Sequence, residues 1–291
     1  MSELVGQLLF GLAIGSIYSL VAIGFSMIFR ATGLLHFALP ELMMMGGMIG
    51  YTLATSTALP LPLLFILSGL AVAVLSYLID LFGFRPMRRH GASLNQVIAT
   101  IGWSIILVNV ALFVWGTAPL SYPEQYAPKG HAFAGIVIVP QNLAMLGVGL
   151  VAMAALHVFF TRTVVGQALR ATAENPVAAQ LMGIKVERMM AVTFLLSGFL
   201  AGGAGVMVAS VVYANFDLGQ VGIKAFAAAV LGGFGHVGGA MAGGLLLGLI
   251  ETIGAFYVSS AFKDIIAYTL LILILLLRPL GIFGSGRARS D

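Results

Sequence analysis

The sequence predicts an all-α polytopic membrane protein, and two features of its composition indicate this class. Of the 291 residues, 60% are hydrophobic and 8% are charged, whereas ordinary globular domains contain about 25% charged residues. A soluble fold has too little interior to hide so much apolar surface. The 37 glycines support the same class, because glycine is frequent in membrane helices and lets their backbones approach closely. Pairs with Gly-x-x-x-Gly spacing, such as Gly11/Gly15 and Gly244/Gly248, are interpreted as helix-packing surfaces.

About eight hydrophobic segments follow one another along the chain. They lie at about 4–29, 36–55, 61–83, 93–116, 140–160, 189–212, 223–256 and 263–283. The first residues lack the basic region of a cleaved signal peptide, so the first segment is expected to belong to the mature protein. We expect residues 1–291 to form a single transmembrane domain.

Basic residues orient these segments, because cytoplasmic loops carry an excess of Lys and Arg. The loops 117–139 and 213–222 have few charges and are expected outside, which places the N-terminus outside and the C-terminus in the cytoplasm. The residues that mark the cytoplasmic side are Arg85, Arg88, Arg89, Arg162, Arg170, Lys185, Arg188, Arg287 and Arg289.

The segment 223–256 does not fit a simple crossing. It has about 34 residues, whereas a single span needs about 20, and the glycine-rich stretch 232–239 interrupts it. We expect this segment to enter from outside, to break near the midplane and to return outside. The last segment then crosses once and leaves the C-terminus inside.

The second segment is also interrupted, because His36, Pro40 and Glu41 lie in an apolar context. Proline inside a helix removes a backbone hydrogen bond. Two interrupted segments entered from opposite faces suggest an inverted repeat, and in transporters such a pair indicates the pathway. The candidate pathway residues are His36, Pro40, Glu41, Gly232, Gly233 and Gly235.

Ionisable residues at membrane depth are costly and therefore informative. Glu41 either touches the pathway or binds a freed backbone N–H, and His36 is expected at the interface. For the others, structural roles are favoured: a hydrogen bond for Glu251, snorkelling to the outer interface for Lys224, and boundary positions for His157 and Asp80.

The polar stretch 161–188 contains six charged residues, whereas the neighbouring segments 140–160 and 189–212 contain none. Within it, Asn175 and Pro176 have the chemistry of a helix start, and Gly183 has that of a helix end. We expect a helix of about two turns at the membrane surface, with Ala178, Ala179 and Met182 on one face. Alternatively, the stretch is an ordinary connector between two membrane helices.

Several kinds of function are excluded by missing motifs. The chain has no P-loop, no His/Cys cluster for a metal and no constellation for catalysis, so an enzyme is not expected. The glycines at 233–238 match Gly-x-Gly-x-x-Gly, but they follow no strand and do not indicate a dinucleotide site. The net charge of +4 is spread over the loops, so nucleic acid is not an expected partner.

Three stretches together resemble a known family. They are similar to the LivH-type permease subunits of branched-chain amino acid ABC importers. The first comprises residues 11–19 with 33–47, the second residues 166–184, and the third residues 224–251 with 278–281. The resemblance covers essentially the whole chain. It differs at Leu39-Pro40, where many relatives have a small or polar residue followed by Gly.

The resemblance implies a multi-pass subunit of the bacterial inner membrane that works by alternating access. A second permease would complete the pathway, two cytoplasmic ATPases would hold ATP and Mg, a periplasmic protein would deliver the substrate, and this chain would need no cofactor. The stretch 161–188 would then be a cytoplasmic coupling loop. Its expected coupling residues are Glu174, Asn175, Pro176, Ala178, Ala179, Gly183 and Ile184.

Branched-chain or other hydrophobic amino acids, or a related small solute, are the expected cargo. The alternative is a stand-alone channel or secondary carrier for a small solute such as urea or an amide. A membrane scaffold is a third class, but interrupted helices have no use in it.

Overall fold

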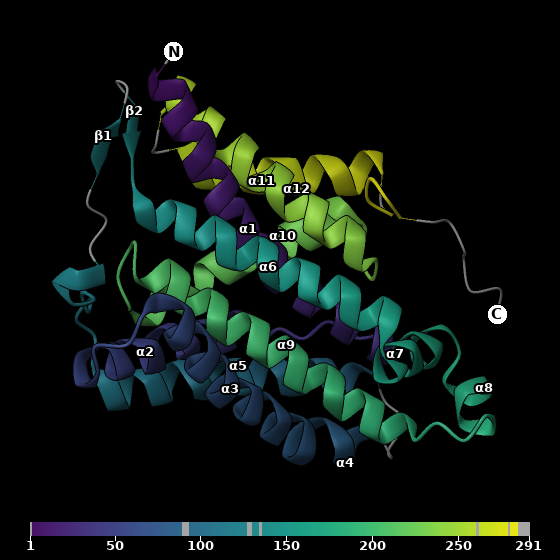
Figure 1. Ribbon diagram of the computed structural model, residues 1–291. Helices are drawn as coiled ribbons and strands as arrows, with labels where there is room; N and C mark the ends of the chain where they lie inside the picture. Colours follow the sequence, from purple (N-terminus) through teal and green to yellow (C-terminus); the bar gives the residue numbers. More distant parts are fainter. Residues whose placement is uncertain are drawn as a thin grey trace.

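The computed structural model describes residues 2–88, 93–126, 130–133, 136–259, 262–278 and 280–284 (Figure 1). Arg89, Arg287 and Arg289, which contributed to the predicted orientation, lie outside these residues. The α-helices are α1 Ser2–Thr32, α2 Leu39–Ser56, α3 Leu61–Ile79, α4 Arg85–Arg88, α5 Ser93–Trp115, α6 Pro140–Arg162, α7 Val164–Glu174, α8 Pro176–Leu181, α9 Val186–Ala209, α10 Gly219–Gly232, α11 Val237–Tyr257 and α12 Lys263–Leu277. The shorter elements are a π-helix at Asp80–Phe84, 3-10 turns at Glu124–Tyr126 and Phe216–Leu218, and the paired strands β1 His131–Phe133 and β2 Ile136–Ile138.

The predicted all-α membrane fold is confirmed. Among the described residues, six helical spans are long and apolar enough to cross a membrane. They lie on α1, α3, α5, α6, α9 and α11. Three further apolar helices, α2, α10 and α12, have only 18, 14 and 15 residues. The short α2 and α10 agree with the expectation of interrupted segments, because neither reaches the length of about 20 residues that a full crossing needs.

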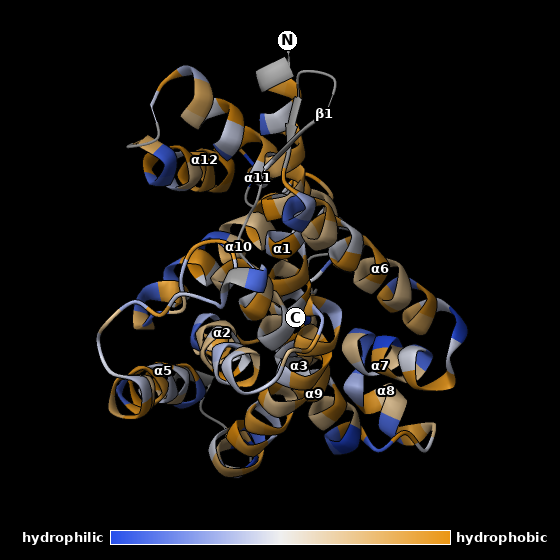
Figure 2. Ribbon diagram, turned by 60° about the vertical axis from the view of Figure 1, so that its left-hand side comes forward, coloured by the Kyte–Doolittle hydropathy of each residue, from blue (hydrophilic) through white to orange (hydrophobic). Residues whose placement is uncertain are grey.

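The helices pack as two related sets, as expected for an inverted repeat. Helix α1 packs antiparallel against α11, and α9 packs antiparallel against α3. In the same way α5 packs on α2 and α12 packs on α10. The series α1, α2, α3, α5 therefore corresponds to α9, α10, α11, α12. Figure 2 shows α12 at the upper left and α5 at the lower left of the molecule, with α6 at the right.

Glycines hold the central helices together, as their spacing predicts. A Cβ atom on Gly248 would overlap the backbone of Gly15 in α1, and one on Gly46 would overlap the backbone of Gly202 in α9. Side-chain hydroxyls add bonds between helices, since the Ser76 hydroxyl donates to the Phe194 carbonyl oxygen at 2.8 Å. Small residues and such bonds hold helices together in lipid, where the hydrophobic effect does not.

The glycine-rich break is not near the midplane, so this expectation is wrong. Helix α10 enters from the side where Leu120 pairs with Ala214. The turn after α10 lies at the opposite end of the bundle, where Gly235 lies beside Phe29 and Arg30 in the last turns of α1. Helix α11 then returns to the first side, as predicted. The reason is that α10 and α11 stay in backbone contact down to the turn, through Gly232 and Gly239.

Candidate functional site

We keep the name coupling loop for the stretch 161–188, after the role expected of it; it contains the two short helices α7 and α8, whose ends are fixed locally. The Asn175 side chain caps α8 by accepting a hydrogen bond from the Ala178 N–H at 2.9 Å, and Pro176 is the first residue of the helix. At the other end Gly183 has φ 85°, which favours glycine. There the Ile184 N–H donates to the Ala179 carbonyl oxygen at 3.0 Å. The predicted start and end of this helix are therefore confirmed.

Helix α8 exposes a surface different from the expected one. Ala179 is buried at 4% exposure and faces its own chain, so the expectation of one face shared by Ala178, Ala179 and Met182 is wrong. The exposed apolar side chains are Val177 at 67%, Leu181 at 84% and Met182 at 83%. Val177 and Leu181 were missed in the sequence, although their spacing of four residues places them on one helical face. We call Val177, Leu181 and Met182 the coupling surface.

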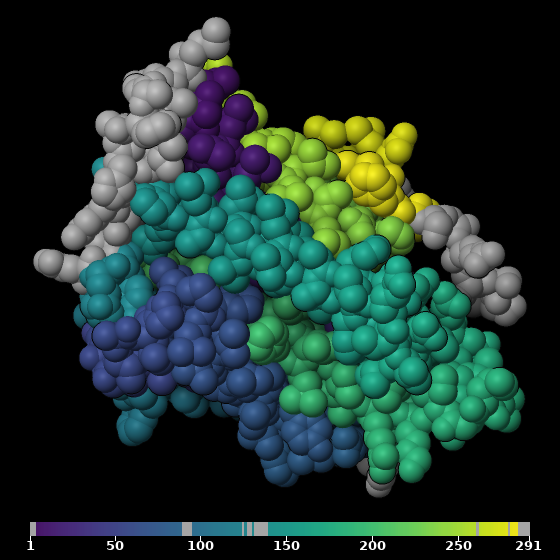
Figure 3. Space-filling view, in the orientation of Figure 1, coloured from purple at the N-terminus to yellow at the C-terminus, as the bar shows by residue number. Residues whose placement is uncertain are grey.

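The coupling loop packs on α1, α6 and α9 through α7, and an ion pair adds a contact with α1. The Arg30 guanidinium, in the last turn of α1, lies 3.4 Å from the Glu174 carboxylate at the end of α7. The Glu174 side chain is 67% exposed, and ion pairs of this kind stabilise a fold only weakly. The pair instead orients the loop, which forms a lobe at one end of the molecule (Figure 3).

Deep in the bundle, the first turns of α2 and α10 meet. A Cβ atom on Gly222 would lie 2.6 Å from the Pro40 Cα, and one on Gly219 would lie 3.6 Å from a Glu41 carboxylate oxygen. Pro40 lies in the first turn of α2 and not in the middle of a helix, which corrects the interpretation of Pro40 as the break. The break is the non-helical stretch 33–38 that precedes it.

Glu41 is the polar group at this junction. Its side chain is half-buried, and its Oε2 atom is buried without a hydrogen-bond partner among the described residues. The Ser104 side chain of α5 lies near this carboxylate. The N-terminus of each helix also carries partial positive charge from the helix dipole. The junction therefore offers one carboxylate and two electropositive helix ends within an apolar bundle.

The other candidate pathway residues lie elsewhere. His36 is 1% exposed and packs edge-on against Phe84 and Phe194, with ring centroids 5.3 and 5.5 Å away, so its ring lies inside the bundle, and its predicted interfacial depth stays a prediction. Its nitrogens have no hydrogen-bond partner among the described residues.

Gly232, Gly233 and Gly235 belong to the turn at the bundle end. The stretch 280–284 packs on this turn, where the Ile282 N–H donates to the Leu231 carbonyl oxygen at 2.9 Å. The structure thus separates the three glycines from Pro40 and Glu41, and does not bring the predicted set together.

Two buried charge clusters were not predicted from the sequence. Lys224 is 8% exposed, and its Nζ lies 2.6 Å from Glu251 and 2.5 Å from Asp264, so it does not snorkel to the interface. The Tyr18 hydroxyl donates to Glu251 at 2.7 Å, which confirms the structural hydrogen bond predicted for that carboxylate.

Asp80 belongs to the second buried cluster, with Arg85 and Arg88, and its predicted boundary position stays a prediction. It is fully buried in the π-helix, 2.9 Å from the Arg88 guanidinium. Unpaired buried charges are strongly unfavourable, so these ion pairs fix the helices that carry them. Within the described ranges no group of three or more His, Cys, Asp or Glu side chains is placed to hold a metal ion.

Comparison with known proteins adds three findings. Residues 7–275 match the family described as "Branched-chain amino acid transport system / permease component". The chain is 36% identical to the high-affinity branched-chain amino acid transport system permease protein BraD of Pseudomonas aeruginosa, over 96% of this chain and 95% of that protein. It is 33% identical to LivH of Escherichia coli K12, over 96% and 94%. Among solved structures, a chain of PsaBC from Streptococcus pneumoniae in complex with Fab has a similar fold, with a TM-score of 0.50 and 15% identity over 96% of this chain and 93% of that one.

Proposed function

Because the chain belongs to the permease-component family of branched-chain amino acid transport systems, we propose that it forms one half of a translocation pathway for branched-chain or other hydrophobic amino acids. It is a multi-pass membrane subunit of an ABC importer. ATP hydrolysis and substrate capture belong to other subunits of such an importer. The identity to BraD and LivH over nearly the whole chain supports this substrate class.

We place the coupling loop in the cytoplasm and the N-terminus outside the inner membrane. The loop 161–188 and the Arg85–Arg88 helix carry basic residues, which favour the cytoplasmic side. In this orientation the turn after α10 and the C-terminal stretch also face the cytoplasm, and the pairing between Leu120 and Ala214 faces the periplasm.

The coupling surface is where the ATPase docks in this proposal. Val177, Leu181 and Met182 are large apolar side chains, yet they are exposed in a polar loop outside the membrane-crossing helices. Exposed apolar patches rimmed by polar groups are typical of protein contacts. This single observation carries the proposed function, because a self-contained carrier has no need for such a surface.

A second permease would pack along α5 and α12, which flank the junction of α2 and α10. Helix α5 is largely exposed, with Phe113 at 92%. The exposed faces also include polar groups, namely Asn109 in α5 and Asp264 in α12, whose side chain is 69% exposed. Polar groups are expensive against lipid, so a water-lined pathway or a subunit interface suits this side better than lipid does.

The junction of α2 and α10 would meet the cargo in the pathway. An amino acid carries an ammonium and a carboxylate, and the junction offers the complementary pair of charges. Glu41 would bind the ammonium, and the partial positive charge that the helix dipole places at the start of α10 would attract the carboxylate. ATP-driven movement of the coupling loop would tilt the helix bundle and expose this junction to each side in turn.

The decisive experiment tests whether the chain works only with ATPase subunits. We expect Leu181→Asp to reduce copurification of the ATPases by about tenfold, as loss of a central apolar anchor does, while the permease remains inserted. Val164→Asp is the matched control, because Val164 is 82% exposed on α7, outside the coupling surface. Substrate uptake by the purified chain alone in vesicles would contradict the proposal and favour a stand-alone carrier.

A further inference from the structure

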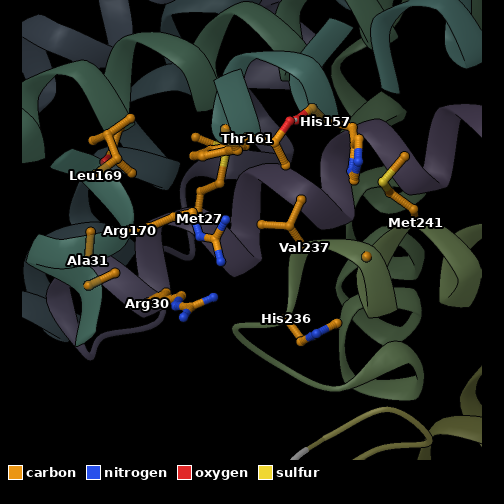
Figure 4. A pocket seen from close by; sticks show the side chains of 14 residues that line it. Met27, Arg30, Ala31, His157, Thr161, Leu169, Arg170, His236, Val237 and Met241 are labelled. Atoms are coloured by element: carbon orange, nitrogen blue, oxygen red, sulfur yellow. The ribbon is translucent and has the colours of Figure 1, made fainter. Parts of the chain in front are cut away.

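A cavity of about 260 Å³ opens at the end of the bundle that carries the coupling loop. Its lining comes from the last turns of α1 and α6, from α7, from Thr193 of α9, and from His236 and the start of α11 (Figure 4). Neither the transport pathway nor the coupling surface includes it. The junction of α2 and α10 contributes no lining residue.

The charge in this cavity is basic. Arg30, Arg170, His157 and His236 line it, and no Asp or Glu is among its lining residues. The ion pair with Glu174 balances Arg30. Arg170 has neither an ion pair nor a hydrogen bond with the residues that the structure describes, and its side chain enters the same space as Arg30 in Figure 4. The cavity therefore keeps an unbalanced positive charge.

Apart from Thr161 and Thr193, the remaining lining is apolar, and most of it lies on membrane-crossing helices. Met27 of α1, Phe160 of α6 and Met241 of α11 form this part of the wall, with Leu169 on α7. A free phosphate ion would gain nothing from contact with these side chains. A molecule with a charged phosphate and an apolar tail would use both parts of the wall.

We propose that this cavity binds the headgroup of an anionic phospholipid. The phosphodiester lies between Arg30 and Arg170, where guanidinium groups donate charge-assisted hydrogen bonds, and the acyl chains run along Met27, Phe160 and Met241. Basic pockets between membrane helices on the cytoplasmic side suit such headgroups.

This site would connect the lipid to the coupling loop. Arg170 lies on α7, which leads directly into α8, and Glu174 at the end of α7 competes with the phosphate for Arg30. A bound headgroup thus replaces a contact between the loop and α1 with contacts to lipid. The inference concerns lipid binding and does not depend on the transported substrate.

The test uses native mass spectrometry of the assembled importer, with phosphatidylglycerol as the anionic lipid and phosphatidylcholine as the neutral one. We expect preferential retention of phosphatidylglycerol. Arg170→Gln should reduce this retention by about fivefold, the effect of one basic residue near an anionic membrane surface. Arg162→Gln is the control, because Arg162 is exposed at the end of α6 and does not line the cavity. Glu174→Gln should increase retention by removing the competing carboxylate.

Three results would overturn the proposal. The first is equal retention of the two lipids by the unaltered importer. The second is retention of phosphatidylglycerol that Arg170→Gln leaves unchanged. The third is displacement of the lipid by millimolar inorganic phosphate, which would indicate a site for free phosphate. Each readout is independent of uptake, so it stands or falls separately from the substrate assignment.

Discussion

The two interruptions of the apolar segments have opposite physical character. At the junction of α2 and α10, two helix N-termini meet around Glu41, and one carboxylate oxygen is buried without a partner in the described part of the chain. At the turn between α10 and α11, backbone touches backbone through Gly232 and Gly239, and the stretch 280–284 adds hydrogen bonds. The first interruption therefore has a polar atom that can still bind a ligand. The backbone of the second is already in close contact and hydrogen-bonded within the protein.

The comparison also identifies the true counterpart of the break before α2. In the inverted repeat α2 corresponds to α10. Helix α2 begins after the non-helical stretch 33–38, and α10 begins after the non-helical stretch 210–215 and the 3-10 turn Phe216–Leu218. The matched positions are therefore Leu39 and Gly219, which start the two helices. Gly233 and Gly235 only join α10 to α11. A glycine-rich stretch thus marks close packing as readily as it marks a functional break.

The largest expected effect comes from filling the turn. Gly232→Leu places a side chain where Gly239 already lies in contact, so α10 and α11 must separate. Overpacking of this kind costs about 3 kcal/mol, and we expect loss of the monodisperse peak in size-exclusion chromatography. The control is Gly238→Ala, whose new Cβ would meet only the His236 ring, at 3.5 Å. A well-folded Gly232→Leu variant would show that the turn is not tightly packed.

Much of the fold follows from short-range signals in the sequence. Apolar length predicted the spans, and the capping chemistry of Asn175, Pro176 and Gly183 predicted the ends of α8 correctly. Glycine spacing predicted which helix faces pack, as at Gly15 with Gly248. These features depend on neighbours within a few residues, which one sequence contains.

The site was less predictable, because its parts come from distant residues. Lys224 gives no sign in the sequence that Glu251 and Asp264 will surround it, so snorkelling looked more favourable than burial. The side of α8 that contacts its own chain depends on α7 and α9, and this decided that Ala179 is buried and Leu181 exposed. The level of the glycine turn depends on how far α10 stays in contact with α11. Such features depend on contacts between distant residues and can be found only in the folded structure.

The second prediction tests whether the junction is a site. Glu41→Gln removes the charge proposed to bind the ammonium of the cargo but keeps the shape of the side chain. Hydrogen bonds to charged groups contribute about 1.5–3 kcal/mol, so we expect uptake by the reconstituted importer to fall by about tenfold or more. Glu187→Gln in the exposed start of α9 should leave uptake unchanged. If Glu41→Gln transports normally at equal protein amount, Glu41 serves only the packing of α2.

The smallest expected effect is that of Pro40→Ala. The direction in which it shifts the thermal midpoint distinguishes between the two interpretations of the break. If Pro40 interrupted a helix, Pro40→Ala would relieve a distortion of about 3 kcal/mol and raise the thermal midpoint. In the structure Pro40 is in the first turn of α2, where proline suits the helix and fixes the chain before it. Replacement by Ala should therefore cost about 1 kcal/mol, because the unfolded chain gains freedom. We expect the thermal midpoint of the variant in detergent to be slightly lower. A raised midpoint would show that Pro40 itself interrupts the helix.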